Sequence, residues 1–350
     1  MPVREVSSSV EVVTRRRYVR AVHLSSYRSS CRISCADDDL GAARVTPFAL
    51  DHLETLRAIV DEGTFEAAAQ RLHMTQSAVS QRIKALERTA GQVLLQRTTP
   101  VVPTAAGDVV LRYARQVQLL AADTAAELGH GARGGASDAG APPPSLALAV
   151  NADSLATWFL DALASLPPEA PVVFDIRRED EERTTTLLRQ GDVLAAVTST
   201  REPIQGCTSE ALGTMRYRAV ASPGYVDRWL GGVPSIGRVD ATPMLSFDRN
   251  DDLQRGFLRR ALGYDPRPPR HYVPSSSDFV RAVGLGLGWA LLPDQQSADD
   301  LAAGRLVELS PGDVVDVELW WQRWTLASPL LDRVSAAVRA GAAGALLPPA

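Results

Sequence analysis

The chain has 350 residues, of which 45% are hydrophobic and 22% are charged, and its formal net charge is −4. This length accommodates two or three domains, and the composition is that of an ordinary globular protein. No apolar run approaches the ~18 residues that a membrane-spanning helix needs, and the slightly acidic balance gives no general sign of nucleic-acid binding. The sequence therefore predicts a protein without a membrane segment, in which any DNA-binding surface is local.

Residues 1–46 are rich in Ser and Arg and show no apolar periodicity, which is typical of a disordered extension. They lack the apolar core of a secretory signal. Two of the three cysteines, Cys31 and Cys35, lie in this segment, and the third is Cys207. This is no disulfide framework, so a reducing cytosol is expected. None of the five histidines is placed to complete a metal site with the cysteines, and we expect no metal and no other cofactor.

Residues 65–87 predict two short helices separated by a tight turn, the pattern of a DNA-reading helix-turn-helix. Small and apolar residues such as Ala68, Val79 and Ile83 recur at helical spacing and form the predicted buried face. Helical hairpins also occur in proteins that never bind DNA. The other face of the second helix carries donors, acceptors and cations suited to bases and phosphates, namely Gln76, Ser77, Ser80, Gln81, Arg82 and Lys84.

Residues 92–107 favour DNA binding over that alternative, because they read as a strand, a turn at Pro100 and a second strand. Such a wing beside the recognition helix places Arg97 to contact a phosphate or the minor groove. Thr64 is expected to cap the first helix of the motif and to lie near phosphate. The predicted DNA-binding set is completed by Thr64, Thr75, Arg97 and Thr98.

The order and spacing of these residues resemble the LysR-type transcriptional regulators. The matching run is Ala-Ala-x-x-Leu-x-x-x-Gln-Ser-Ala-Val-Ser-x-x-Ile-x-x-Leu-Glu, which begins here at Ala68. The resemblance implies a winged helix-turn-helix domain over residues 47–107. It also implies that Gln76, Ser77, Ser80 and Gln81 enter the major groove of a double-stranded DNA operator, and that Arg97 is the wing arginine.

Residues 104–128 predict one long helix, of which residues 108–128 follow the winged domain as a linker. Its apolar positions fall close to a seven-residue repeat and would pair helices, at Val110, Ala114, Val117, Leu120, Thr124 and Leu128. The alternative is a helix that packs only on its own wing. The resemblance implies dimerisation through this helix. The Gly- and Pro-rich residues 129–144 are expected to be a flexible hinge.

Residues 145–350 alternate strands and helices, with strands near residues 146–150, 172–176, 193–197 and 289–292. We therefore expect an α/β effector domain, which makes the whole chain a multi-domain α+β protein. Two further strands, near residues 212–220 and 314–321, are candidates for crossings between two lobes. The family resemblance implies the two-lobed architecture of the periplasmic solute-binding proteins.

Several polar residues follow strands or begin helices in this domain, where ligands of such sheets bind. Hydroxyl and N–H groups at these places suit an α-carboxylate, while Asp153 and Asp248 could hold ammonium groups. The alternative for each single residue is helix capping alone. The candidate effector-binding residues are Asn151, Asp153, Ser154, Thr198, Asp248, Ser276 and Ser277.

Residues 151–158, residues 177–184 and the Phe247-Asp248 pair resemble the LysG/ArgP branch of the family. This branch senses lysine and arginine and usually activates a basic amino-acid exporter gene, and some members were described as inhibitors of chromosome replication initiation. The resemblance implies a cytoplasmic homodimer or homotetramer that responds to lysine or arginine, works with RNA polymerase and catalyses nothing.

Two other classes remain as alternatives. An α/β enzyme is prompted by Gly284-Leu-Gly-Leu-Gly288, but this run joins a helix to a strand and lacks the dinucleotide-binding spacing. No nucleophile elbow, P-loop or metal-spaced histidine cluster accompanies it. The second alternative is a nucleoid or replication-origin protein that binds DNA and ignores amino acids.

Overall fold

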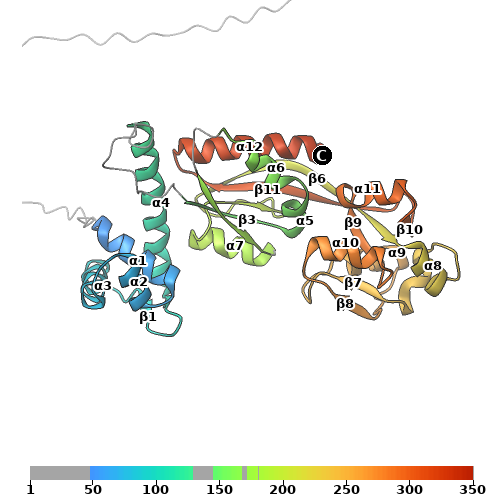
Figure 1. Ribbon diagram of the computed structural model, residues 1–350, viewed down its shortest axis with the longest axis horizontal. Helices are drawn as coiled ribbons and strands as arrows, with labels where there is room; N and C mark the ends of the chain where they lie inside the picture. Colours follow the sequence, from blue (N-terminus) through green and yellow to red (C-terminus); the bar gives the residue numbers. More distant parts are fainter. Residues whose placement is uncertain (1–47, 129–144, 168–171, 180, 350) are drawn as a thin grey trace, which may run out of the picture. The chain divides into compact units, whose positions relative to one another are not determined.

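The computed structural model describes residues 48–128, 145–167, 172–179 and 181–349 (Figure 1). The predicted extension, with Cys31 and Cys35, and the predicted hinge at residues 129–144 lie outside these ranges. Within them, no helix combines the length and apolar character needed to cross a membrane.

The first described region is a winged helix-turn-helix, as predicted. The core between its three helices is formed by fully buried aliphatic side chains such as Leu56, Ile59 and Ile83. The hairpin of β1 and β2 is antiparallel and supplies the wing. The elements in chain order are α1 (Leu50–Glu62), α2 (Phe65–Arg71), α3 (Gln76–Ala90), β1 (Leu95–Gln96), β2 (Val102–Pro103) and α4 (Ala105–Glu127).

Local backbone chemistry sets the tight path through α2 and α3. Gly63 ends α1 in the left-handed region, with φ of 73°, which glycine adopts without steric cost. The Thr64 hydroxyl then caps α2 by accepting from the Ala67 N–H at 3.1 Å. Thr75 caps α3 in the same way, accepting from the Ala78 N–H at 3.2 Å. The two caps fix where each helix of the motif begins.

Helix α4 differs from the predicted pairing seam. Val110 and Ala114 are each only 6% exposed and pack in the core of the winged domain, so they are not available to a partner helix. The seven-residue repeat did not predict this, because it does not show that one side of α4 packs against α1. Two predicted seam residues, Leu120 and Leu128, are exposed, and so are the large apolar residues Val109 and Tyr113, which the seven-residue count did not include.

The effector domain is built on a seven-stranded sheet in which two long antiparallel strands, β6 (Cys207–Ala221) and β11 (Val314–Trp324), pair along their length. The carboxyl-terminal part of β11 pairs with β5 (Ala195–Thr198). The carboxyl-terminal part of β6 pairs with β9 (Ala290–Pro293) and β10 (Val307–Glu308). These two strands are the predicted crossings, and we call the β5 side lobe I and the β9 side lobe II.

Lobe I holds the parallel strands β3, β4 and β5. Helices α6 and α12 cover one face of its sheet, and α7 covers the other (Figure 1). The helix after β3 runs without a break through α5, a π-helical turn and α6. Besides β5, its elements are β3 (Ser145–Val150), α5 (Ala152–Ser154), the π turn (Leu155–Phe159), α6 (Leu160–Ala164), β4 (Val173–Arg178), α7 (Glu181–Gln190) and α12 (Pro329–Ala345).

Lobe II has its own apolar cluster, in which Phe279 and Val283 of its helix α10 pack on Leu292 of β9. The Gly-rich run singled out in the sequence lies here. A Cβ on Gly288 would come within 3.2 Å of the Leu245 backbone, so close packing explains that glycine. The further elements are α8 (Pro223–Leu230), a 3₁₀ turn (Ile236–Ala241), β7 (Met244–Ser246), α9 (Leu253–Leu262), β8 (Arg270–Tyr272), α10 (Ser276–Gly284) and α11 (Asp294–Ala302).

Two glycines of α12 provide a matched test of helix packing in lobe I. A Cβ on Gly341 would lie 2.5 Å from the Ala162 Cβ of α6, whereas a Cβ on Gly344 meets nothing within 4 Å. Gly341→Ala is therefore expected to destabilise the domain by roughly 1–3 kcal/mol through overpacking. Gly344→Ala should be neutral or stabilising by up to about 1 kcal/mol, because alanine favours a helix. Thermal unfolding of both variants checks this, and equal effects would contradict the close packing of α12 on α6.

Candidate functional site: a recognition helix and a lobe junction

The outer face of α3 carries most of the predicted base-reading residues. Gln76, Ser77, Gln81 and Lys84 are exposed, and Ser80 is partly exposed. The opposite face holds Val79, Ile83 and Leu86, which are buried in the core of the winged domain. A helix fixed on one side with short polar groups on the other is the form that enters a DNA major groove.

Three other predicted DNA-binding residues have partners within the domain. Arg82 forms a 3.2 Å ion pair with Asp51 and lies 3.4 Å from the Thr55 hydroxyl, so it ties α3 to α1. Thr64 and Thr75 use their hydroxyls as helix caps. The predicted cap at Thr64 is thus confirmed, while the structure gives Arg82 a positioning task that the sequence pattern did not reveal.

The wing presents Arg97 directly after β1. Its guanidinium lies 5.6 Å from the centroid of the Phe65 ring, which steadies an otherwise exposed side chain. Thr98 is engaged within the wing, since its hydroxyl donates to the Pro100 carbonyl at 2.6 Å. Of the two, Arg97 keeps a charged group available for a phosphate.

The effector candidates of lobe I and lobe II meet at Asp153. Tyr217 of the crossing strand β6 donates its hydroxyl to Asp153 Oδ2 at 2.8 Å. Ser276, the first residue of α10 in lobe II, donates to Asp153 Oδ1 at 2.9 Å. Gln296 of α11 supports Ser276 with an amide donated at 3.1 Å. We call this group of four residues the lobe junction, because it joins both lobes and a strand that crosses between them.

Burial dominates the electrostatics of the lobe junction. It raises the pKa of Asp153 above its ordinary value, although the hydrogen bonds from Tyr217 and Ser276 favour the ionised form. Burial and the neighbouring Asp153 carboxylate together raise the pKa of Tyr217 well above its ordinary value. No ion pair with Asp153 is present among the described residues. The junction therefore holds an acid that lacks a protein cation.

The other predicted effector-binding residues, apart from Asp248, differ in their surroundings. Asn151 Oδ1 and the fully buried Ser154 hydroxyl have no hydrogen-bond partner among the residues that the structure describes. Thr198 is buried, and its hydroxyl accepts from the Thr200 N–H at 3.1 Å. Ser277, next to Ser276, is exposed and is not part of the junction.

Asp248 has partners within its own turn, after β7. Its Oδ1 accepts from the N–H groups of Asn250 and Asp251, at 2.7 and 3.0 Å, and so closes a turn. The more deeply buried carboxylate is Asp251. Burial raises its pKa, opposed by N–H bonds from Phe247 and Leu253 and reinforced by the charges of Asp248 and Asp153. Asp251 is thus a second acid of this region, and the charge of Asp153 contributes to raising its pKa.

Sequence reasoning missed Tyr217, Asp251 and Gln296. The Asp251-Asp252 pair ahead of α9 was a usable signal, because it follows β7 at a strand end of the kind that supplied the other candidates. Tyr217 and Gln296 carried no local signal. Tyr217 lies in the middle of a strand, and Gln296 lies inside a helix.

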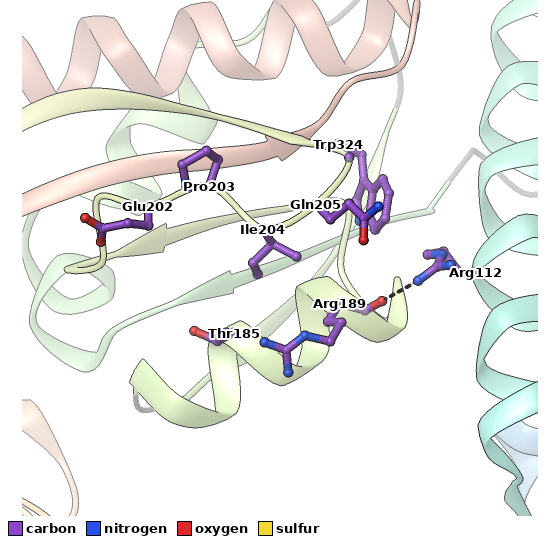
Figure 2. A pocket seen from close by; sticks show the side chains of 9 residues that line it. Arg112, Thr185, Arg189, Glu202, Pro203, Ile204, Gln205 and Trp324 are labelled. Carbon is purple, nitrogen blue, oxygen red and sulfur yellow. Dashed lines mark hydrogen bonds between the residues drawn. The ribbon is translucent and has the colours of Figure 1, made fainter.

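A separate hollow of about 600 Å³ is lined by α7, the 202–206 loop, Trp324 and Arg112 of α4 (Figure 2). Arg112 donates to the Arg189 carbonyl at 2.9 Å and stacks 5.4 Å from the Trp324 ring. None of the predicted effector-binding residues lines this hollow.

Cys207 is half-buried. Burial raises the pKa of its thiol to about 11, which leaves the thiol protonated and unreactive at neutral pH.

Comparison with known proteins agrees with both parts of the structure. Residues 50–108 match the family model described as bacterial regulatory helix-turn-helix protein, lysR family, and residues 139–343 match the LysR substrate binding domain. The lysine export transcriptional regulatory protein LysG of Corynebacterium efficiens is 45% identical, covering 82% of this chain and 95% of its own. The chain belongs to the LysR family of bacterial transcriptional regulators.

Two solved structures place it within that family. The crystal structure of ArgP from Mycobacterium tuberculosis superposes with a TM-score of 0.75 at 40% identity, covering 85% of this chain and 98% of the other. Full-length LysG from Corynebacterium glutamicum with bound effector Arg superposes with a TM-score of 0.66 at 39% identity, covering 86% of this chain and all of the other. The LysG/ArgP resemblance is therefore confirmed.

The raised pKa of Asp153 predicts a stability effect with a definite sign. The folded protein holds this proton to higher pH than the unfolded chain does, so stability falls as the pH rises from the ordinary value through the raised pKa. Asp153→Asn removes the ionisable group, while an amide can still accept from Tyr217 and donate to Ser276. At neutral pH the variant without ligand should melt at a higher temperature than the wild type, and the difference should shrink in acid.

Asp161→Asn is the matched control, because Asp161 is exposed on the same continuous helix. Because it lies outside the lobe junction, this substitution should not reproduce the effect of Asp153→Asn on the melting temperature. Scanning calorimetry between pH 4 and 8 makes the comparison. A lower melting temperature of Asp153→Asn at neutral pH would contradict the conclusion that burial destabilises the ionised form of Asp153.

Proposed function

We propose that the protein is a sequence-specific transcription regulator that responds to lysine or arginine and activates a gene for export of basic amino acids. The observation that carries the proposal is the buried carboxylate of Asp153 at the lobe junction, with Asp251 as a second acid and no ion pair to either among the described residues. A cationic ligand would stabilise both charges at once.

The chemistry of the junction fits an amino acid with a basic side chain. Such a ligand carries two cationic groups and one carboxylate, and we assign Asp153 to one of the cations. Two buried polar atoms, Asn151 Oδ1 and Ser154 Oγ, lack a hydrogen-bond partner in the described part of the chain, and a polar ligand would satisfy them. The proposed effector-binding residues are the seven that the sequence predicted, together with Asp251. The related LysG of Corynebacterium glutamicum, solved with bound effector Arg, supports this choice of ligand.

The DNA-binding proposal rests on α3 and the wing. Gln76, Ser77, Ser80, Gln81 and Lys84 would read or contact the operator, while Arg97 would hold its backbone. Arg82, Thr64, Thr75 and Thr98 would act through positioning, because each has a partner inside the domain.

We further propose that the protein works in the cytoplasm as a homodimer or homotetramer and catalyses no reaction. The exposed apolar residues on α4, Val109, Tyr113 and Leu120, are the surface through which two linker helices would pair. RNA polymerase is the partner that an activator bound beside a promoter would contact. The relatives reported above are regulators, which favours this interpretation over an enzyme.

Calorimetric titration of the full chain with amino acids tests the effector. L-Lysine and L-arginine should bind, whereas L-norleucine and L-citrulline, which lack the side-chain charge, should bind at least tenfold more weakly, because one charge-assisted contact is lost. Asp153→Asn should lose binding of the basic amino acids and keep operator binding, and Asp161→Asn should change neither. Equal affinity for citrulline and arginine would refute the charge argument, and operator binding that ignores both amino acids would favour the nucleoid alternative.

Measurements of operator binding by variants distinguish residues that contact bases from residues that contact the DNA backbone. Gln76→Ala or Ser80→Ala should relax sequence preference, since each base contact is worth ~1–3 kcal/mol of discrimination. Arg97→Ala should instead weaken all sequences similarly and reduce the slope of log affinity against log salt by about 1. Fluorescence anisotropy on matched and scrambled duplexes at several salt concentrations distinguishes these outcomes. If all three variants lose affinity in parallel with no change in preference, α3 is not the recognition helix.

A further inference from the structure

Arg178 occupies the strand end next to the lobe junction. It is the last residue of β4, and in the parallel register of β3 and β4 it lies beside Val150. Val150 ends β3 and directly precedes the Asn151–Ser154 segment that carries Asp153. The carboxyl ends of neighbouring parallel strands form the edge of a sheet at which small ligands bind. Arg178 therefore brings a guanidinium to the edge that carries Asp153.

The contacts of this guanidinium cross from lobe I to lobe II. Arg178 Nη1 donates to the Pro274 carbonyl at 2.9 Å, and its Cζ lies 5.4 Å from the centroid of the Phe247 ring. Phe247 follows β7, and Pro274 directly precedes Ser275, the cap of α10. Ser276, two residues beyond Pro274, donates to Asp153. A single short segment of lobe II thus contacts both the cation and the acid of lobe I.

The partners of Arg178 are electrically neutral. Among the described residues, no carboxylate lies within ion-pair distance of it, whereas its neighbour Arg177 is paired with Asp175 at 3.1 Å. Arg178 is also exposed, so little desolvation accompanies a change of partner. A guanidinium binds a carboxylate more strongly than a backbone carbonyl, because both partners are charged and two parallel hydrogen bonds can form.

We propose that Arg178 binds the α-carboxylate of the amino-acid effector and that this contact sets the requirement for a free carboxylate. The inference rests on the proposed function. The ligand then spans the junction, with its carboxylate on Arg178 and a cationic group on Asp153, and Arg178 exchanges its bond to Pro274 for the ligand. Arg178 is in this way a specificity residue for α-amino acids over amines of the same side chain.

A ligand and residue cycle tests the proposal with the full-length protein. L-Argininamide keeps both cationic groups of L-arginine and replaces the carboxylate with a neutral amide. The wild type should bind L-arginine roughly tenfold to a hundredfold more tightly than L-argininamide, the range of one charge-assisted contact. The Arg178→Gln variant should bind the two ligands with about equal affinity, because its binding of arginine weakens and its binding of argininamide does not. Arg178→Lys keeps the charge and should retain part of the preference.

Arg177→Gln is the matched control, because this arginine lies on the same strand and already has a carboxylate partner. It should leave the preference at the wild-type value. An Arg178→Gln variant that keeps the full preference, or that loses both ligands equally, would overturn the carboxylate assignment. A wild type that binds neither arginine nor lysine would instead refute the proposed function, so the two failures are distinct.

Discussion

The pairing of β6 with β11 is the constraint on which the effector domain depends. The two antiparallel strands stay hydrogen-bonded from Val314 opposite Arg218 to Trp324 opposite Cys207, and they contribute to both lobes. Their register shifts once, between Leu319 and Trp320, close to Gly213 with φ of 141°. A Cβ at Gly213 would lie 2.5 Å from the Leu347 carbonyl, because the carboxyl-terminal segment pairs with Thr214 at this point. A glycine is required where three segments of chain meet.

This ladder explains why Tyr217 belongs to the lobe junction. The backbone of a crossing strand is held by hydrogen bonds to strands of both lobes. The position of Tyr217 is therefore tied to both lobes. Asp153 comes from the first turn of the lobe I helix, and Ser276 from the first turn of α10 in lobe II. Any movement of one lobe against the other must change at least one of the hydrogen bonds to Asp153.

Much of this architecture could be predicted from the sequence, and the misses have physical causes. The helix-turn-helix, the wing, the long α4 and the strands β3, β4, β5 and β9 all carry local signals in periodicity and turn chemistry. The seam on α4 failed at Val110 and Ala114, because periodicity shows which residues are apolar and not which neighbour covers them. Asp248 and Asp251 are three residues apart, and only the folded turn shows which carboxylate caps it and which is buried. The ion pair of Arg82 with Asp51 could not be predicted for the same reason, since Asp51 lies on another helix.

The distribution of tryptophan has a practical consequence for following the protein at work. The described winged domain and linker helix, residues 48–128, contain none, and the six of the whole chain all fall between residues 145 and 349, namely Trp158, Trp229, Trp289, Trp320, Trp321 and Trp324. Trp289 and Trp321 are almost fully buried, one in the core beside Phe257 and the other beside Phe159. Tryptophan emission therefore reports on the effector domain alone. Duplex DNA does not fluoresce where tryptophan emits. A change in the effector domain can therefore be followed by fluorescence while the recognition helix is bound to its operator.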